Sequence, residues 1–97
     1  MTKVLSRKAA RQFLERCLNT GELTATKHCL GRMKRRGFDF DDVANVIRRG
    51  EILTVAYDSQ HQNFKLAVAG EDLDGIELTL ELGLEIEESL TIVITGF

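Results

Sequence analysis

Hydrophobic residues recur every three or four positions in the first half of the chain and every second position in the second half. The first spacing is typical of amphipathic helices, and the second is typical of strands with one buried face. The change of spacing falls at Gly50. The pattern therefore predicts helices before Gly50 and strands after it, which makes an α+β domain.

Two helices are predicted before residue 38. Ser6 can cap a first helix that runs to about Leu18, because its hydroxyl accepts a hydrogen bond from a free amide of the first turn. Thr24 or Thr26 can cap a second helix, and Gly37 is suited to the left-handed conformation that follows a helix end.

A third helix is predicted from its opening residues. Asp39 and Asp42 have the spacing of a capping box, and Phe38 and Val43 occupy the two positions of a hydrophobic staple. Gly50 ends this helix. Capping explains why acidic residues gather here, so we do not interpret them as a metal site.

Four strands are predicted after Gly50, and short polar turns separate them. They are Ile52 to Tyr57, Phe64 to Ala69, Ile76 to Ile86, and Leu90 to Thr95, the last with Leu90, Ile92 and Ile94 alternating. Short connections favour antiparallel pairing. We therefore expect three N-terminal helices packed on one face of a four-stranded antiparallel sheet, with an open, acidic opposite face.

Length and composition indicate how many domains the chain forms and which classes of protein it can belong to. A chain of 97 residues is expected to form a single domain. No apolar run approaches the roughly 18 residues of a membrane span, and the N-terminus lacks the apolar segment of a signal peptide. We expect a cytoplasmic protein without membrane contact. Cys17 and Cys29 fall on apolar helix faces and are expected to be reduced core residues. Neither a metal site nor a cofactor motif is found.

The net charge of −2 conceals an asymmetry. Residues 1–50 contain 12 Lys and Arg against 5 Asp and Glu, whereas residues 51–97 contain one Lys against 10 Asp and Glu. A basic half is what a nucleic-acid contact needs, because neutralising phosphates drives much of that affinity. Attraction between the two halves, or to a partner subunit, is the alternative.

The second helix carries the main candidate chemistry. His28, Arg32 and Arg36 are four residues apart and line one side of it, next to an apolar stripe of Thr26, Cys29, Leu30 and Met33. An imidazole can transfer protons near neutral pH, and guanidinium groups can hold a phosphate. The alternative is that His28 packs at the helix edge while the arginines form a solvated face.

The strands add fewer candidates. Lys65 is the only Lys or Arg after Arg49, and it either contacts an anion or pairs with one of the many Glu side chains. Thr91 and Thr95 are expected on one face of the last strand, where a hydroxyl could assist a phosphate site. Tyr57 is interpreted as a half-buried packing residue and His61 as a solvated residue of a polar turn.

The chain resembles a bacterial domain-of-unknown-function family, number 4258. The resemblance covers Leu23 to Thr95, outside the first helix. It rests on Thr26-x-His28-x-x-x-Arg32-Met33-x-x-Arg36-Gly37, Asp42-Val43, Gly50 and the terminal Val93-Ile94-Thr95. The family is similar to the superfamily of barnase-like, colicin-type and RelE/ParE-type toxins. That resemblance implies helices on a four-stranded antiparallel sheet and, often, metal-independent ribonuclease activity.

The leading hypothesis is a RelE/barnase-like domain that acts on RNA as a metal-independent ribonuclease or a toxin-like protein. His28 is its candidate acid/base; the resemblance draws Arg32, Arg36 and Thr95 into the phosphate site, and our interpretation of the strands adds Lys65. The alternative is a non-catalytic nucleic-acid or protein-binding module that uses the same basic helix face. Candidate partners are RNA, an antitoxin-like or other protein, and a second copy of the chain.

Overall fold

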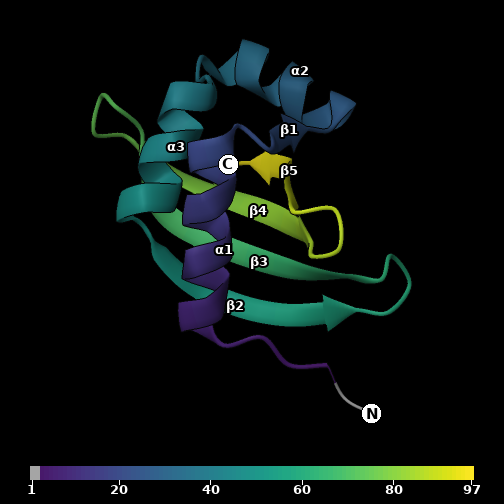
Figure 1. The fold of residues 1–97 in the computed structure, drawn as a ribbon. Helices are drawn as coiled ribbons and strands as arrows, with labels where there is room; N and C mark the ends of the chain where they lie inside the picture. The colour runs from purple at the N-terminus through teal and green to yellow at the C-terminus, as the bar shows by residue number, and fades with distance from the viewer. Residues whose placement is uncertain (1–2) are drawn as a thin grey trace.

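The computed structural model describes residues 3–97, and its helices all lie in the first half of the chain, whereas four of its five strands follow them (Figure 1). The elements are α1 (Arg7–Thr20), β1 (Leu23–Ala25), α2 (Lys27–Arg36), α3 (Phe40–Arg49), β2 (Glu51–Asp58), β3 (Asn63–Glu71), β4 (Glu77–Glu85) and β5 (Leu90–Gly96). The α+β class is as predicted. The three predicted helices are all present, and the longest predicted strand is one continuous strand, β4.

The sheet has five strands in the order β1-β5-β4-β3-β2 and is mixed, so the prediction of four antiparallel strands was wrong. Strands β2 to β5 form the expected antiparallel meander, but β1 pairs with β5 in parallel. Leu23 lies opposite Thr91, and Ala25 lies opposite Val93. A very short strand whose partner lies at the far end of the chain leaves no periodic signal in the sequence.

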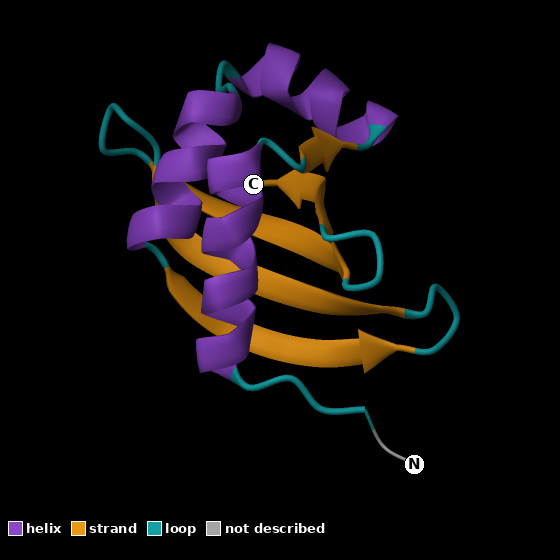
Figure 2. Ribbon diagram, in the orientation of Figure 1, coloured by secondary structure: helices purple, strands orange, loops and turns teal. Residues whose placement is uncertain are grey.

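The helices take two positions around the sheet (Figure 2). Helices α1 and α3 lie over one face, whereas α2 lies beside β1 and β5 at one edge. The expectation of three helices on a single face therefore holds for two of them. The opposite face of the sheet carries no helix among the described residues, so it is called the uncovered face below.

Predicted helix caps are present in the structure. The Ser6 hydroxyl accepts a hydrogen bond from the Ala9 amide, and the Thr26 hydroxyl accepts one from the Cys29 amide. Helix α1 runs two residues beyond Leu18, to Thr20, and ends at Gly21, whose φ of 79° is left-handed. Both cysteines are buried and free, as expected.

Strand β5 presents the opposite face from the one its alternation suggested. Thr91 and Val93 are fully buried beneath the helices, whereas Leu90, Ile92 and Ile94 are half-buried on the uncovered face. The pairing of β5 with β4 then shifts by one residue, because Leu82 lies opposite Val93 but Glu81 lies opposite Thr95. Thr91 lies opposite the buried Leu84 and Thr95 opposite Glu81, so the two threonines do not share a face.

Asp42 joins the start of α3 to the loop before β4. Its side chain accepts hydrogen bonds from the Asp39 amide at 2.9 Å and the Leu73 amide at 2.8 Å. The first of these completes the predicted capping box. The Leu73 hydrogen bond is the main reason that the pKa of Asp42 lies below its ordinary value of 3.8. Burial opposes this shift, and the Asp39 amide adds to it.

Replacing Asp42 is expected to destabilise the fold in a pH-dependent way. At pH 7, Asp42→Ala should lower the free energy of unfolding by about 1–3 kcal/mol, because the Asp39 and Leu73 amides both lose the carboxylate that accepts their hydrogen bonds. Because the folded-state pKa is lowered, the contribution is complete above the ordinary pKa of 3.8 and is lost as the pH falls through the folded value.

Urea unfolding at pH 7 and at stepwise lower pH measures this difference. Asp74→Ala is the matched control, since Asp74 is exposed in the same loop and its carboxylate has no hydrogen-bond partner among the described residues. The control should change stability by less than about 0.5 kcal/mol. An Asp42→Ala effect that stays constant from pH 7 to well below the ordinary pKa of 3.8 would contradict the linkage.

Candidate functional site

Helix α2 is fixed to the last strand by the residue that caps it. The Thr26 amide donates to the Val93 carbonyl at 3.0 Å, and the Thr26 hydroxyl donates to the Ile94 carbonyl at 2.9 Å. These bonds continue the pairing of β1 with β5 into the start of the helix. Cys29 and Met33 face the core, but Leu30 is 48% exposed, contrary to the predicted stripe. A helix at a sheet edge buries a narrower arc than one lying over a face.

His28 and Thr95 are brought together by this attachment. The Nε2 atom of His28 lies 3.3 Å from the Thr95 hydroxyl, and the hydrogen bond joins α2 to the end of β5. Both groups are accessible to solvent there. Glu81 is the cross-strand neighbour of Thr95 on β4. An imidazole, a hydroxyl and a carboxylate therefore border the uncovered face at the α2 edge.

Arg32 has a structural contact that the sequence did not predict. Its Nε donates to the Gly96 carbonyl at 3.1 Å, which ties the middle of α2 to the last residue of β5. Burial raises the pKa of the Cys29 thiol, and the nearby Arg32 charge partly opposes that shift. Arg32 is half-buried, and its Nε group is used in a structural hydrogen bond. The other nitrogens of its guanidinium group lie beside His28 on the same helix.

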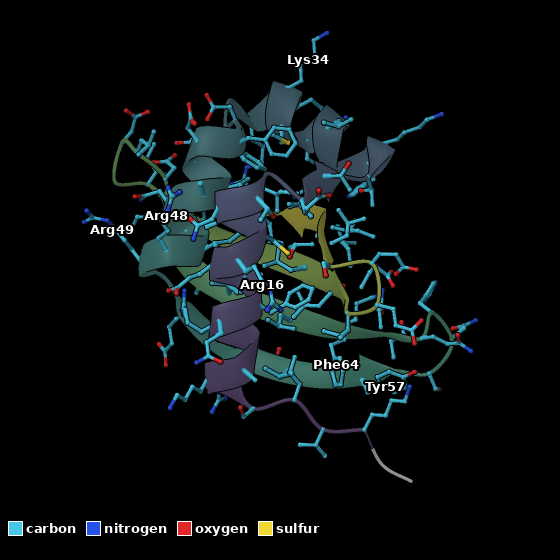
Figure 3. The ribbon with its side chains drawn as sticks, viewed as in Figure 1. Arg16, Lys34, Arg48, Arg49, Tyr57 and Phe64 are labelled. Atoms are coloured by element: carbon cyan, nitrogen blue, oxygen red, sulfur yellow. The ribbon has the colours of Figure 1, made fainter. Side chains whose placement is uncertain are left out.

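The other cations of α2 are exposed. They are Lys27, Lys34, Arg35 and Arg36. In residues 3–97, none of the four forms an ion pair or a side-chain hydrogen bond. Figure 3 shows Lys34 pointing away from the body of the protein at the outer side of α2. Arg36, the last arginine of the predicted motif, therefore has a free guanidinium group.

Helix α1 differs, because its arginines serve the fold. Arg11 donates to the Ile47 carbonyl and, at 2.7 Å, to the Gly50 carbonyl. Arg7 donates to the Leu53 carbonyl at 2.8 Å. These arginines satisfy carbonyl groups at the end of α3 and on the outermost strand, β2. The arginines of α1 therefore serve partly as structural contacts.

Lys65 lies on the uncovered face, but its ammonium contacts residues at the β2–β3 turn, away from α2. Its ammonium donates to Asn63 Oδ1 at 2.8 Å and lies 3.4 Å from Asp58. Its acidic neighbour is thus an aspartate and not one of the glutamates. The hydrogen bond from His61 is the main cause that lowers the pKa of Asp58 to about 2. The structure does not bring this ammonium to His28.

A shallow groove on the uncovered face adds two residues that the sequence reasoning missed. It encloses about 200 Å³, and Lys65, Glu81 and Phe97 line it together with small side chains of β2 and β3. Phe97 is held there because its amide and carbonyl both pair with Thr79. Glu81 was visible in the sequence as a polar position of an alternating strand, whereas nothing in the sequence indicated the position of Phe97.

Residues 3–97 contain no group of three His, Cys, Asp or Glu side chains placed to bind a metal ion. None of their helices combines the length and the apolar character needed to cross a bilayer.

Comparison with protein-family models assigns the chain to a family. A model of the family described as "Domain of unknown function (DUF4258)" matches residues 25–95. The chain belongs to the DUF4258 family. The match begins at the last residue of β1 and reaches Thr95, so the part of the chain shared with DUF4258 contains α2, α3 and the antiparallel meander but not α1. None of the curated proteins matches this chain.

The unequal roles of two motif arginines can be measured. Arg32→Ala should lower the free energy of unfolding by about 1 kcal/mol, because the Gly96 carbonyl loses its donor. Arg36→Ala removes the same group from the same helix without breaking a contact and should change stability by less than about 0.5 kcal/mol. Urea unfolding of both variants tests this difference, and equal losses would contradict the assignment.

Proposed function

We propose that this DUF4258 domain binds RNA through the exposed cations of α2. The observation that carries the proposal is that Lys27, Lys34, Arg35 and Arg36 are exposed and without acidic partners in residues 3–97. A chain with a net charge of −2 contains enough carboxylates to pair them. Its carboxylates instead lie mainly on the strands and hairpins, which leaves α2 as a separate basic surface.

Phosphates suit this surface better than single small anions. Lys27 lies at the start of α2 and Lys34, Arg35 and Arg36 lie in its last turn, so the charges are found at both ends of a ten-residue helix, and a phosphate backbone offers charges over a comparable length. Each phosphate neutralised releases counterions, so such binding weakens steeply with salt. His28 and Arg32 extend the surface towards the uncovered face, where the groove around Lys65 and Phe97 lies.

Binding of a short single-stranded RNA should therefore depend on α2 and on salt. Arg35→Ala with Arg36→Ala should weaken binding about tenfold at low salt. The same double variant should reduce the slope of log affinity against log salt by about 0.7 for each phosphate that it no longer neutralises. Fluorescence anisotropy of a labelled oligonucleotide at several salt concentrations measures both quantities.

Arg48→Ala with Arg49→Ala is the matched control, because it removes the same charge from the last turn of α3. Figure 3 shows Arg48 and Arg49 on α3, away from α2. The control should change affinity no more than about twofold, since these residues lie outside the surface. Equal losses in the two double variants would mean that net charge alone governs binding. Salt-insensitive binding, or none, would favour an acidic or antitoxin-like protein as the partner.

Metal-independent RNA cleavage at the same surface is the second candidate. It is favoured by the contact of His28 Nε2 with Thr95, which holds an imidazole beside Arg32 at the edge of the uncovered face. In RNA, the 2′-hydroxyl gives its proton to a base and attacks the adjacent phosphorus, which forms a 2′,3′-cyclic phosphate. The bond from phosphorus to the 5′-oxygen of the next nucleotide breaks, and that oxygen takes up a proton. His28 would transfer a proton in this step, and arginine side chains would stabilise the charge on the phosphate oxygens.

Cleavage of RNA with EDTA present distinguishes this activity from simple binding. His28→Ala should lower the cleavage rate at least about 100-fold, as expected for loss of a general acid or base, and should leave RNA affinity within about threefold. Thr95→Val keeps the size of the side chain but removes the hydroxyl that contacts His28, so it should give a smaller loss. Failure of the wild type to cleave, or full activity of His28→Ala, would leave RNA binding alone as the proposed function.

A further inference from the structure

A cleft of about 360 Å³ lies at the opposite end of the sheet from the attachment of α2. It is formed where the β2–β3 and β4–β5 hairpins approach the N-terminal segment. Strand β5 starts at Leu90, opposite Glu85 and next to this cleft, and ends at Gly96, below α2. The cleft is therefore separate from the surface described above, and its volume is in the lower range of small-molecule sites.

Two aromatic side chains form one wall of the cleft. The rings of Tyr57 and Phe64 meet edge to face, with centroids 5.2 Å apart. Figure 3 shows both residues beside α1, towards the hairpin end of the sheet, and Tyr57 is only half-buried. Ile86, which is 44% exposed, adds an apolar side chain to the lining. The wall offers both an aromatic face and an aliphatic surface.

A cation of the chain itself already lies at this wall. The ammonium of Lys3 is 5.0 Å from the centroid of the Tyr57 ring, within the range of a cation–π interaction. This contact indicates that the face of the Tyr57 ring is accessible to an ammonium group. It also means that Lys3 would compete with any other ammonium group that enters.

Carboxylates supply the opposite charge. Glu85, Glu87 and Glu88 line the cleft, and among residues 3–97 the last two have neither an ion pair nor a side-chain hydrogen bond. Glu85 is joined to Asn63 at 3.0 Å and is held at the border of the cleft. Two carboxylates without partners in the described chain thus lie near an aromatic face that attracts a cation.

We propose that this cleft binds a short aliphatic di- or polyamine. Its alkyl segment would pack on Tyr57, Phe64 and Ile86, one ammonium would take the place of Lys3 over the tyrosine ring, and another would pair with Glu87 or Glu88. A ligand with one charge would leave one of these two features unused. The site does not depend on RNA binding by α2, so either proposal can fail without the other.

The sequence provides a direct probe of the cleft. Tyr57 is the only tyrosine and the chain has no tryptophan, so ultraviolet fluorescence of the folded protein comes chiefly from this wall. Titration of the full chain with spermidine and with 1,5-diaminopentane should give a saturable change in Tyr57 emission. Butylamine, with one charge, and a short peptide with a single lysine should bind about tenfold more weakly or not at all.

Two pairs of variants locate the binding. Glu87→Gln with Glu88→Gln should weaken spermidine binding about tenfold, whereas Asp74→Asn with Glu77→Gln, the same loss of charge at the other end of β4, should change it less than about twofold. Lys3→Gln should tighten binding about threefold by removing the internal competitor. Lys8→Gln removes the same charge from α1 outside the cleft and should have a smaller effect.

The proposal is overturned if spermidine causes no saturable change in emission, or if the two acidic double variants lose affinity equally. It is also overturned if the lysine peptide binds as tightly as spermidine, because the cleft would then recognise a protein side chain. All the substituted side chains lie outside the core, so the variants should fold. Calorimetry on the same samples checks that a silent fluorescence signal reflects absent binding.

Discussion

The structure depends on the attachment of α2 to β5. Strand β1 is only three residues long, yet its parallel pairing with β5 continues through the two hydrogen bonds of Thr26 into the first turn of the helix. Arg32 then joins the middle of α2 to Gly96. Because β1, Thr26 and Arg32 pair with backbone groups along β5, these groups are satisfied and α2 has a fixed orientation.

The cations of the protein differ in their contacts. Arg7, Arg11 and Arg32 donate to backbone carbonyls, and their charges stabilise the ends of helices and strands. The exposed cations of α2 have no such partner among the described residues. Acidic residues are arranged in the opposite way, since Asp39 and Asp42 cap α3 while the glutamates of β4 and its hairpin remain accessible.

Local signals made much of the fold predictable. Ser6 and Asp39 each cap a helix as predicted, and Thr26, one of the two predicted candidates, caps the second helix, because capping depends on neighbouring residues. Strand β1 and the phase of β5 were not predictable in this way. Pairing of Leu23 with Thr91 is set by the tertiary structure, and β5 has aliphatic residues on both faces, so alternation cannot show which face is buried.

The candidate site was predictable in its residue types and less so in its geometry. The spacing of His28, Arg32 and Arg36 indicated a polar helix face, but the contact of His28 with Thr95 requires α2 to follow β1 along β5. The sequence offered Lys65 as a partner for the same site, whereas the turn that places Asp58 and Asn63 holds its ammonium elsewhere.

Chemical-shift mapping of backbone amides during titration with a short RNA tests the central claim most directly. The account predicts that the largest shifts fall in residues 27–36 and at Thr95 and Gly96. Shifts concentrated in α1 and α3, with α2 unchanged, would contradict it.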